Sequence, residues 1–157
     1  MNQINIRTYQ NSDASPLWQL KFNTIRRINS RDYQPDQVQA WAPEHISAEL
    51  WQKRADAMAP FIAEINGEIV GFADLQADGY IDHFFCHAEH QGQGVGKALM
   101  DHIFTAGKEA GIARLYANVS ITARPFFEHF GFRVLKQQQA EINGRVLTNF
   151  LMEHHIG

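Results

Sequence analysis

Several segments of the chain alternate between hydrophobic and polar residues or form short apolar runs, and both patterns predict β-strands. These segments are residues 4–9, 61–65, 69–73, 80–87, 113–119, 132–142 and 145–153. Two Asn-Gly pairs, Asn66-Gly67 and Asn143-Gly144, lie between consecutive segments. Because Asn-Gly favours the tight turns that join antiparallel strands, each pair predicts a β-hairpin.

Elsewhere apolar residues recur at three- and four-residue spacing, which predicts helices. The predicted helices are residues 12–30, two short helices in 35–57 that separate near Pro43, residues 95–110, and a short helix from Pro125. Ser12 or Asp13 can cap the first helix, and Gly111 can end the helix 95–110. The order of elements predicts one α/β domain over residues 1–157, with a mixed central sheet flanked by helices.

Residues 91–97, Gln-Gly-Gln-Gly-Val-Gly-Lys, connect the strand 80–87 to the helix 95–110. Glycine at alternate positions allows unusual backbone angles and lets a ligand approach the backbone closely. A helix that begins directly after such a turn directs unpaired N–H groups and the positive end of its dipole to the same place. The turn therefore predicts a cradle for a diphosphate, and a glycine-rich turn without a ligand is the alternative interpretation.

Two common phosphate motifs do not fit this turn. A Walker A loop needs Ser or Thr after Gly-Lys, and here Ala98 follows Gly96-Lys97. The dinucleotide fingerprint needs a third glycine where this chain has Lys97. The pattern that fits is Gln91-x-x-Gly94-x-Gly96. It resembles the acyl-coenzyme A loop of the GNAT superfamily (Gcn5-related N-acetyltransferases).

A second stretch resembles the other signature of that superfamily, a short helix that ends in Tyr-Glu-x-x-Gly-Phe. Here residues 127–132 read Phe-Glu-His-Phe-Gly-Phe, and one strand separates them from the glycine turn. The resemblance covers nearly the whole chain and is greatest to the bacterial YafP-like branch. The motifs shared with that branch are Tyr80-Ile81-Asp82, Ile121-Thr122-Ala123, Pro125-Phe126-Phe127-Glu128 and Thr148-Asn149-Phe150.

The resemblance implies the GNAT fold and an acetyl-CoA-dependent N-acetyltransferase. The acetyl group would pass from acetyl-CoA to the amine of a small molecule or peptide by direct attack. A non-catalytic acyl-CoA-binding sensor domain is the alternative. The coenzyme contacts that the resemblance implies are Phe84, Phe85, Cys86, Gln91, Gly92, Gln93, Gly94, Val95, Gly96, Lys97, Asn118, Ser120 and Phe127.

The catalytic candidates lie on the strand before the glycine turn. Strand alternation would place residues 80, 82, 84 and 86 on one face, which makes Asp82 the best candidate for a general base. A carboxylate paired with a basic residue is the alternative for Asp82. A backbone N–H near Cys86 would meet the oxyanion, by analogy with the family. Direct attack needs no enzyme nucleophile, so a covalent role for the Cys86 thiol is disfavoured.

The helix signature departs from the family at Phe127, because family members usually have a tyrosine there that protonates the departing thiolate. Tyr116 on the neighbouring strand is a candidate substitute. Tyr33 and Trp41 lie in the segment that folds over the acceptor site in this family, and their rings could hold an apolar or aromatic amine. Their alternative role, and the expected role of Trp51, is to anchor short helices in the core.

Composition indicates which cellular compartment and which binding partners to expect. The net charge of −3 differs from the basic character of nucleic-acid-binding domains, so we expect no nucleic-acid partner. No apolar run approaches the roughly 18 residues of a membrane span, and the first residues lack the apolar core of a signal peptide. The single cysteine suits a reducing compartment. We expect a cytoplasmic protein without a metal, and the sequence is compatible with a homodimer.

Overall fold

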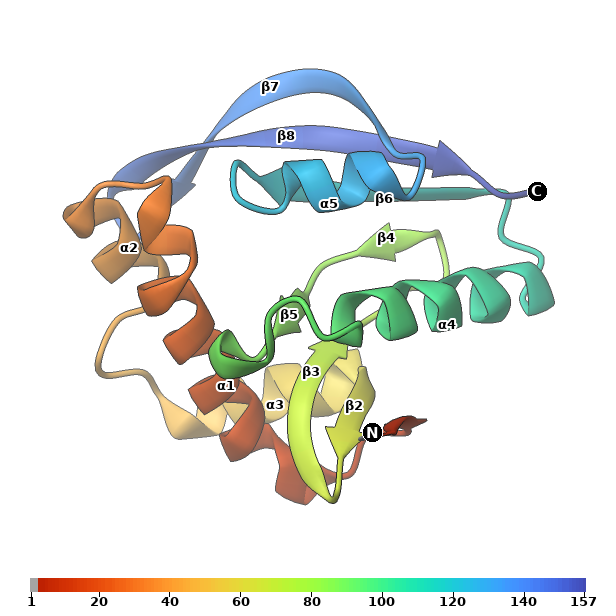
Figure 1. Ribbon diagram of the computed structural model, residues 1–157. Coiled ribbons are helices and arrows are strands. Elements are labelled where there is room, and N and C mark those ends of the chain that lie inside the picture. Colours follow the sequence, from red (N-terminus) through yellow and green to blue (C-terminus); the bar gives the residue numbers. More distant parts are fainter. Residues whose placement is uncertain (1–2) are drawn as a thin grey trace.

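The computed structural model describes residues 3–157, in which strands and helices follow one another as Figure 1 shows. The strands are β1 (Ile4–Arg7), β2 (Phe61–Ile65), β3 (Glu68–Ala73), β4 (Tyr80–Ile81), β5 (Phe84–Cys86), β6 (Arg114–Ser120), β7 (Arg133–Ile142) and β8 (Arg145–His155). The α-helices are α1 (Ala14–Arg27), α2 (Pro35–Trp41), α3 (Ala48–Met58), α4 (Val95–Glu109) and α5 (Arg124–His129). Short 3-10 helices cover η1 (Asn11–Asp13), η2 (Asn29–Arg31) and η3 (Ala88–His90). The predicted domain began at residue 1, and its first two residues lie outside the described part.

The strands form two four-stranded sheets, and the chain passes from one sheet to the other between β4 and β5. One sheet has the order β1-β2-β3-β5 and is antiparallel throughout. The other has the order β4-β6-β8-β7, in which β4 and β6 are parallel and the other pairs are antiparallel. Because β5 pairs with β3 and not with β6, the strands β5 and β6 diverge; in Figure 1 β5 lies near the centre and β6 lies above it, behind α5. The predicted α/β class with a mixed sheet is confirmed.

One predicted strand is wrong in its extent. Residues 80–87 were expected to form a single strand, but β4 and β5 are separate and Asp82 and His83 lie between them. The cause is Asp74, whose carboxylate accepts hydrogen bonds from the backbone N–H groups of Asp82 and His83 at 2.7 and 2.9 Å. Those N–H groups are therefore not available to the ladder with β6. Alternation along one continuous strand, which was the argument for a shared face, does not hold here.

Helices cover the two faces of the first sheet, and successive residues of β3 show how. Gly71 faces α4, where a Cβ atom would lie only 2.8 Å from Val95 Cγ1, so the missing side chain lets the helix pack closely. Phe72 faces the other way and belongs to a buried cluster with Leu17 of α1 and Trp51 of α3. Such alternation is the normal geometry of a strand.

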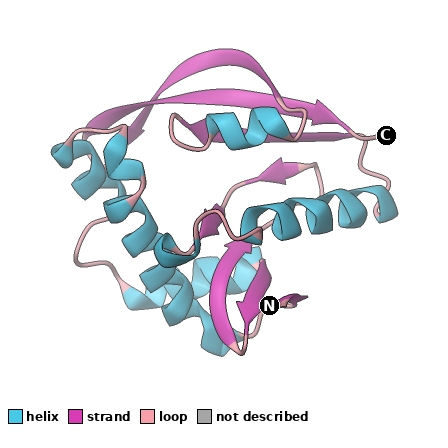
Figure 2. Cartoon of the chain, viewed as in Figure 1, coloured by secondary structure: helices cyan, strands magenta, loops and turns pink. Residues whose placement is uncertain are grey.

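Both predicted hairpins are confirmed, and they are easy to follow in Figure 2. Each Asn-Gly pair has two positive φ angles, as the tight hairpin turn requires. The first helix is shorter than the predicted 12–30. Asp13 does not cap it through a side-chain hydrogen bond, because its carboxylate binds the Arg7 guanidinium at 2.8 Å. Within residues 3–157 no helix combines the length and the apolar character that crossing a bilayer needs.

Candidate functional site

A cavity of about 1410 Å³ lies where β5 and β6 diverge. Backbone and side chains of both strands line it, together with the glycine turn that precedes α4. Side chains from α1, α2 and α3 line another part of it. One continuous space therefore joins a glycine-rich helix N-terminus to a polar and aromatic chamber, which suits a long ligand with an anionic part.

The glycine turn has the geometry of an anion cradle. Gly92 and Gly94 have φ angles of +75° and +85°, in the left-handed region that favours glycine. Gly94 is the N-cap of α4, so the first amides of that helix have no acceptor within the helix. Gly96 has no room for a side chain, because its Cβ would lie 2.8 Å from the Phe126 ring. Val95 is buried in the core and fixes the helix start.

The side chains of the turn have structural partners. Gln91 Nε2 donates to the carbonyls of Cys86 and His87 at 3.1 and 3.2 Å, so it stabilises the turn itself. Lys97 is exposed and bonds Asp101 one helical turn along, at 2.6 Å. Gln93 is exposed and is not among the residues that line the cavity. The backbone of the turn, more than its side chains, is therefore the part suited to a diphosphate.

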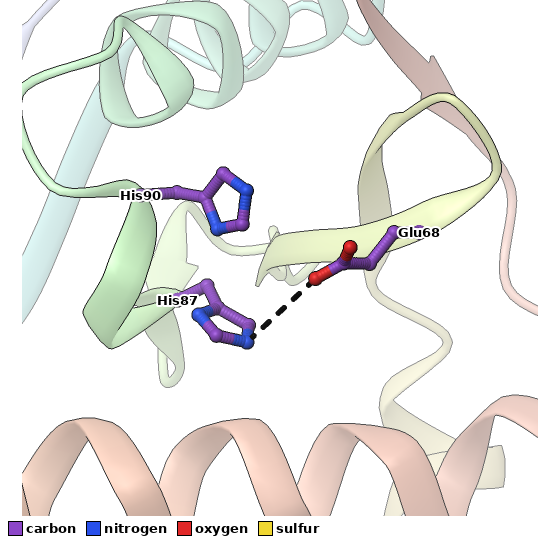
Figure 3. A group of neighbouring side chains, drawn as sticks. All are labelled: Glu68, His87 and His90. Carbon is purple, nitrogen blue, oxygen red and sulfur yellow. Dashed lines mark ion pairs between the residues drawn. The ribbon is translucent and has the colours of Figure 1, made fainter.

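Glu68, His87 and His90 bring three side chains together beside the turn, and their ligand atoms lie within 4.8 Å of one another (Figure 3). Such a group could hold a metal ion. However, His87 Nδ1 accepts a hydrogen bond from the Glu89 backbone N–H, so Nε2 carries the ring proton. That nitrogen faces Glu68 at 3.9 Å, which is the contact drawn in Figure 3. A protonated nitrogen is not a metal ligand, so this arrangement does not favour a metal.

Strand β5 offers free backbone groups to the cavity. The backbone groups of His83 and His87 form hydrogen bonds with β3 and the residue that follows it. Since residues of an antiparallel strand alternate between facing the partner strand and facing away, these bonds fix the direction of the backbone groups between them. The N–H groups of Phe84 and Cys86 therefore point away from β3. The Cys86 side chain is a poor nucleophile, since burial raises the pKa of its thiol to about 12. The backbone N–H of Cys86, and not its thiol, is therefore the group that β5 offers to the cavity.

Asp82 lies in a small charged network. Its carboxylate bonds Arg54 at 3.0 Å and His83 Nδ1 at 3.0 Å. The hydrogen bond from His83 and the nearby Arg54 hold the pKa of Asp82 well below its usual range. Asp82 is thus an anion at neutral pH and a weak base, and the predicted alternative of a paired carboxylate describes its surroundings.

Tyr80 brings to the cavity a hydroxyl group that the sequence pattern did not reveal. It lies 3.4 Å from Asp82 and accepts a hydrogen bond from Asn118 at 3.2 Å. Burial raises the pKa of Tyr80, so its hydroxyl stays protonated and can donate a proton. Tyr116, the predicted substitute for the missing family tyrosine, donates to Asp78 and is not among the lining residues.

Phe127 and Ser120 both line the cavity. Phe127 is buried, with the rings of Phe84 and Phe132 at 5.6 and 5.0 Å. The Ser120 hydroxyl accepts a hydrogen bond from the Ala123 N–H, so it supports the turn before α5. These contacts of both residues are structural.

Aromatic side chains line the part of the cavity that lies against α1, α2 and α3. The Tyr33 hydroxyl donates to the Thr148 carbonyl and accepts from the Ile121 N–H. Tyr33 therefore links the segment before α2 to β8. Trp41 is partly exposed, with its ring 5.7 Å from Tyr33. Trp51 is buried and donates to the Ala14 carbonyl at 2.6 Å, in agreement with an anchoring role.

Lys21 is the cavity residue that sequence reasoning missed most plainly. It occupies the buried stripe of α1, next to Leu20 and one turn from Leu17 and Thr24. A lysine within an otherwise apolar stripe was a readable signal, because a buried charge is uncommon without a partner. Its partner, His83, could not be read from the sequence.

Comparison with known proteins gives the class. Residues 29–154 match the acetyltransferase (GNAT) domain family. The N-acetyltransferase YafP of Escherichia coli K12, described as uncharacterized, is 35% identical over 154 residues, which is 98% of this chain and 97% of that protein. The chain therefore belongs to the GNAT family, whose co-substrate is acetyl-CoA, and it is an N-acetyltransferase.

Solved structures agree with the fold. A GCN5-related N-acetyltransferase from Rhodopseudomonas palustris superposes with a TM-score of 0.93 at 27% identity, over 99% of this chain and 97% of that one. The PaiA N-acetyltransferase from Thermoplasma acidophilum, solved with coenzyme A, superposes with a TM-score of 0.74 at 18% identity. That match covers 98% of this chain and 99% of the other.

Proposed function

We propose that this N-acetyltransferase passes the acetyl group of acetyl-CoA directly to the amine of a small molecule or peptide. The observation that carries the proposal is the single cavity that joins the glycine turn, the free edge of β5 and Asp82. The amides of residues 92–97 would hold the diphosphate, and the space between β5 and β6 would take the pantetheine arm. The thioester would then lie beside Cys86 and Asp82.

In the proposed reaction the neutral amine attacks the thioester carbonyl carbon. The oxyanion accepts a hydrogen bond from the Cys86 backbone N–H, which β3 does not use. The amine nitrogen becomes much more acidic once it is bonded to that carbon. Even a weak base such as the Asp82 carboxylate can therefore take its proton, directly or through water.

Departure of the coenzyme A thiolate completes the reaction. The carbon–sulfur bond breaks, the sulfur takes the Tyr80 hydroxyl proton, and coenzyme A leaves as a free thiol. Asp82 then returns its proton to Tyr80 across the 3.4 Å contact. The amide product and the thiol are the only products, and no covalent enzyme intermediate forms.

Thiol release from acetyl-CoA in the presence of a broad amine panel tests this proposal, with mass detection of the acetylated product. We expect release that depends on the amine and a product that is heavier by one acetyl group. Thiol release without any acetylated amine would contradict it.

A second candidate is a sensor that binds acyl-CoA without catalysis, and Phe127 favours it because the ring has no proton to donate. A sensor would bind acetyl-CoA in calorimetry and release no thiol with any amine. The present arrangement favours the enzyme, because Tyr80 offers a hydroxyl beside Asp82.

A further inference from the structure

A buried lysine without an anionic partner lies in the cavity wall. Lys21 is 7% exposed and is among the lining residues. Its Nζ lies 2.9 Å from Nε2 of His83, and within residues 3–157 it forms no ion pair. An ammonium has three N–H donors. The donors that His83 does not use are available to a ligand.

The protonation of His83 follows from its two neighbours. Its Nδ1 lies 3.0 Å from the Asp82 carboxylate, which can only accept, so Nδ1 carries the proton. Nε2 therefore accepts a hydrogen bond from Lys21. Burial lowers the pKa of His83 to about 4, so the imidazole is neutral and does not balance the lysine charge.

The aromatic neighbours of Lys21 do not supply a negative charge either. Its Nζ lies 5.4, 5.7 and 5.8 Å from the ring centroids of Trp51, Trp18 and Phe85. Aromatic faces attract a cation, but they do not replace a counter-ion in a desolvated site. Asp82 is already paired with Arg54 at 3.0 Å. A buried cation surrounded in this way is prepared for an anion that enters with the ligand.

We propose that Lys21 binds a carboxylate of the acceptor, so that the acceptor class is amino acids and related amino carboxylates with an apolar or aromatic side chain. The proposal rests on the proposed transfer to an amine. His83 connects Lys21 to Asp82, the proposed proton acceptor, so a compound with neighbouring amine and carboxylate groups could engage both. The rings of Trp18, Trp41 and Phe85 would contact its side chain.

The decisive experiment compares free amino acids with their amides, at saturating acetyl-CoA, for leucine, methionine, phenylalanine and tryptophan. We expect at least one acid to be preferred over its amide by about 30-fold or more in kcat/KM, as a buried charge pair implies. Lys21→Met should reduce that ratio to near one while acetyl-CoA affinity is kept. Lys53→Met, at an exposed lysine of α3, is the matched control and should keep the ratio. Equal use of acid and amide by the parent protein, or an unchanged ratio in Lys21→Met, would overturn the proposal.

A binding measurement separates this proposal from the transfer reaction itself. 3-Phenylpropionate and 4-methylpentanoate carry a carboxylate and no amine, and calorimetry with the protein saturated in coenzyme A reports their binding directly. We expect binding of at least one to the parent and about 30-fold weaker binding to Lys21→Met. If no amine is acetylated, the proposed function fails, but the calorimetric binding of these carboxylates still decides the role of Lys21. Absent binding, or equal binding to both proteins, would overturn it. Lys21→Gln repeats the comparison if the methionine variant unfolds on heating earlier than the parent.

Discussion

The Asp74 carboxylate accepts a 2.7 Å hydrogen bond from the backbone N–H of Asp82. Asp74 is 1% exposed, and its second bond of this kind comes from His83. A buried side chain thus takes two main-chain donors at the point where the chain leaves one sheet for the other. The break that it stabilises separates β4 from β5 and gives the cavity its opening between β5 and β6.

Removing this carboxylate should damage both stability and coenzyme binding. Asp74→Ala leaves two N–H groups, one buried and one partly buried, without an acceptor, so we expect a loss of about 2–4 kcal/mol in the free energy of unfolding. Asp74→Asn keeps an acceptor oxygen and should stay within about 1 kcal/mol of the parent. Chemical denaturation and acetyl-CoA calorimetry check this, and equal stability of the two variants would show that the hydrogen bonds are not the cause.

A side chain in the glycine cradle should weaken acetyl-CoA binding, which we expect in the micromolar range for the parent, of order −8 kcal/mol. Gly94→Val would strain the backbone at its φ of +85°, so Gly94→Asn is the cleaner change, since asparagine tolerates this region. Its side chain has space in the protein, with Ile4 at 3.8 Å from the new Cβ. We expect affinity to fall about tenfold or more by calorimetry.

Gly111→Asn is the control for that change. Gly111 has a φ of +72° and nothing within 4 Å of an added Cβ, but it lies at the other end of α4. The Gly111→Asn protein should bind acetyl-CoA with the parent affinity, and its loss of stability should be similar to that of Gly94→Asn. Equal affinity of a folded Gly94→Asn protein would remove the turn from the coenzyme site.

Asp82→Asn should lower turnover by about 10²–10⁴ with coenzyme affinity close to the parent value. Asparagine keeps the size of the side chain but cannot take the amine proton, and it loses the charge that pairs with Arg54. Steady-state kinetics with the best amine of the panel measures the effect, and Glu49→Gln on the exposed side of α3 is the control. Near-parent turnover across the pH range would remove Asp82 from the mechanism.

The source of the thiolate proton can be tested with a pair of hydroxyl changes. Tyr80→Phe should lower turnover by about 100-fold, at the lower end of general acid catalysis because a thiolate leaves readily. Phe127→Tyr should change it little, because Tyr80 already supplies a proton. A large rise in turnover for Phe127→Tyr at unchanged coenzyme affinity would instead favour an enzyme that lost its acid at that position.

Carboxylate binding at Lys21 should weaken in alkaline solution. Burial lowers the pKa of Lys21 to about 8, and the charged groups that face it are Asp82 and Arg54, with neutral His83 in contact. The protonated lysine binds the anion, so affinity is greatest below pH 8 and decreases as pH rises through it. The carboxylate itself is ionised throughout this range. Calorimetry with 3-phenylpropionate between pH 6 and 9.5 checks the trend, and a flat profile would contradict it.

Local patterns were enough to predict the hairpins, the glycine turn before α4 and the short helix from Pro125. Each depends on residues that are adjacent or one turn apart, such as Asn66-Gly67, whose backbone angles are set by their own chemistry. The strand 80–87 was predicted too long because its interruption comes from Asp74, which alternation within the strand does not reveal. Tyr80 was overlooked for the same reason, since its contact with Asn118 joins different strands.

The sequence by itself determined the family and the glycine turn before α4, because glycines in a turn and a helix start are local properties. The tertiary structure decided the state of the polar groups around the acceptor site. Lys21, Arg54 and His83 come from α1, α3 and the link between β4 and β5, and only their packing makes Asp82 a paired anion and leaves Lys21 without a counter-ion. Charge and burial act through space, so neither could be assigned before the fold brought these residues together.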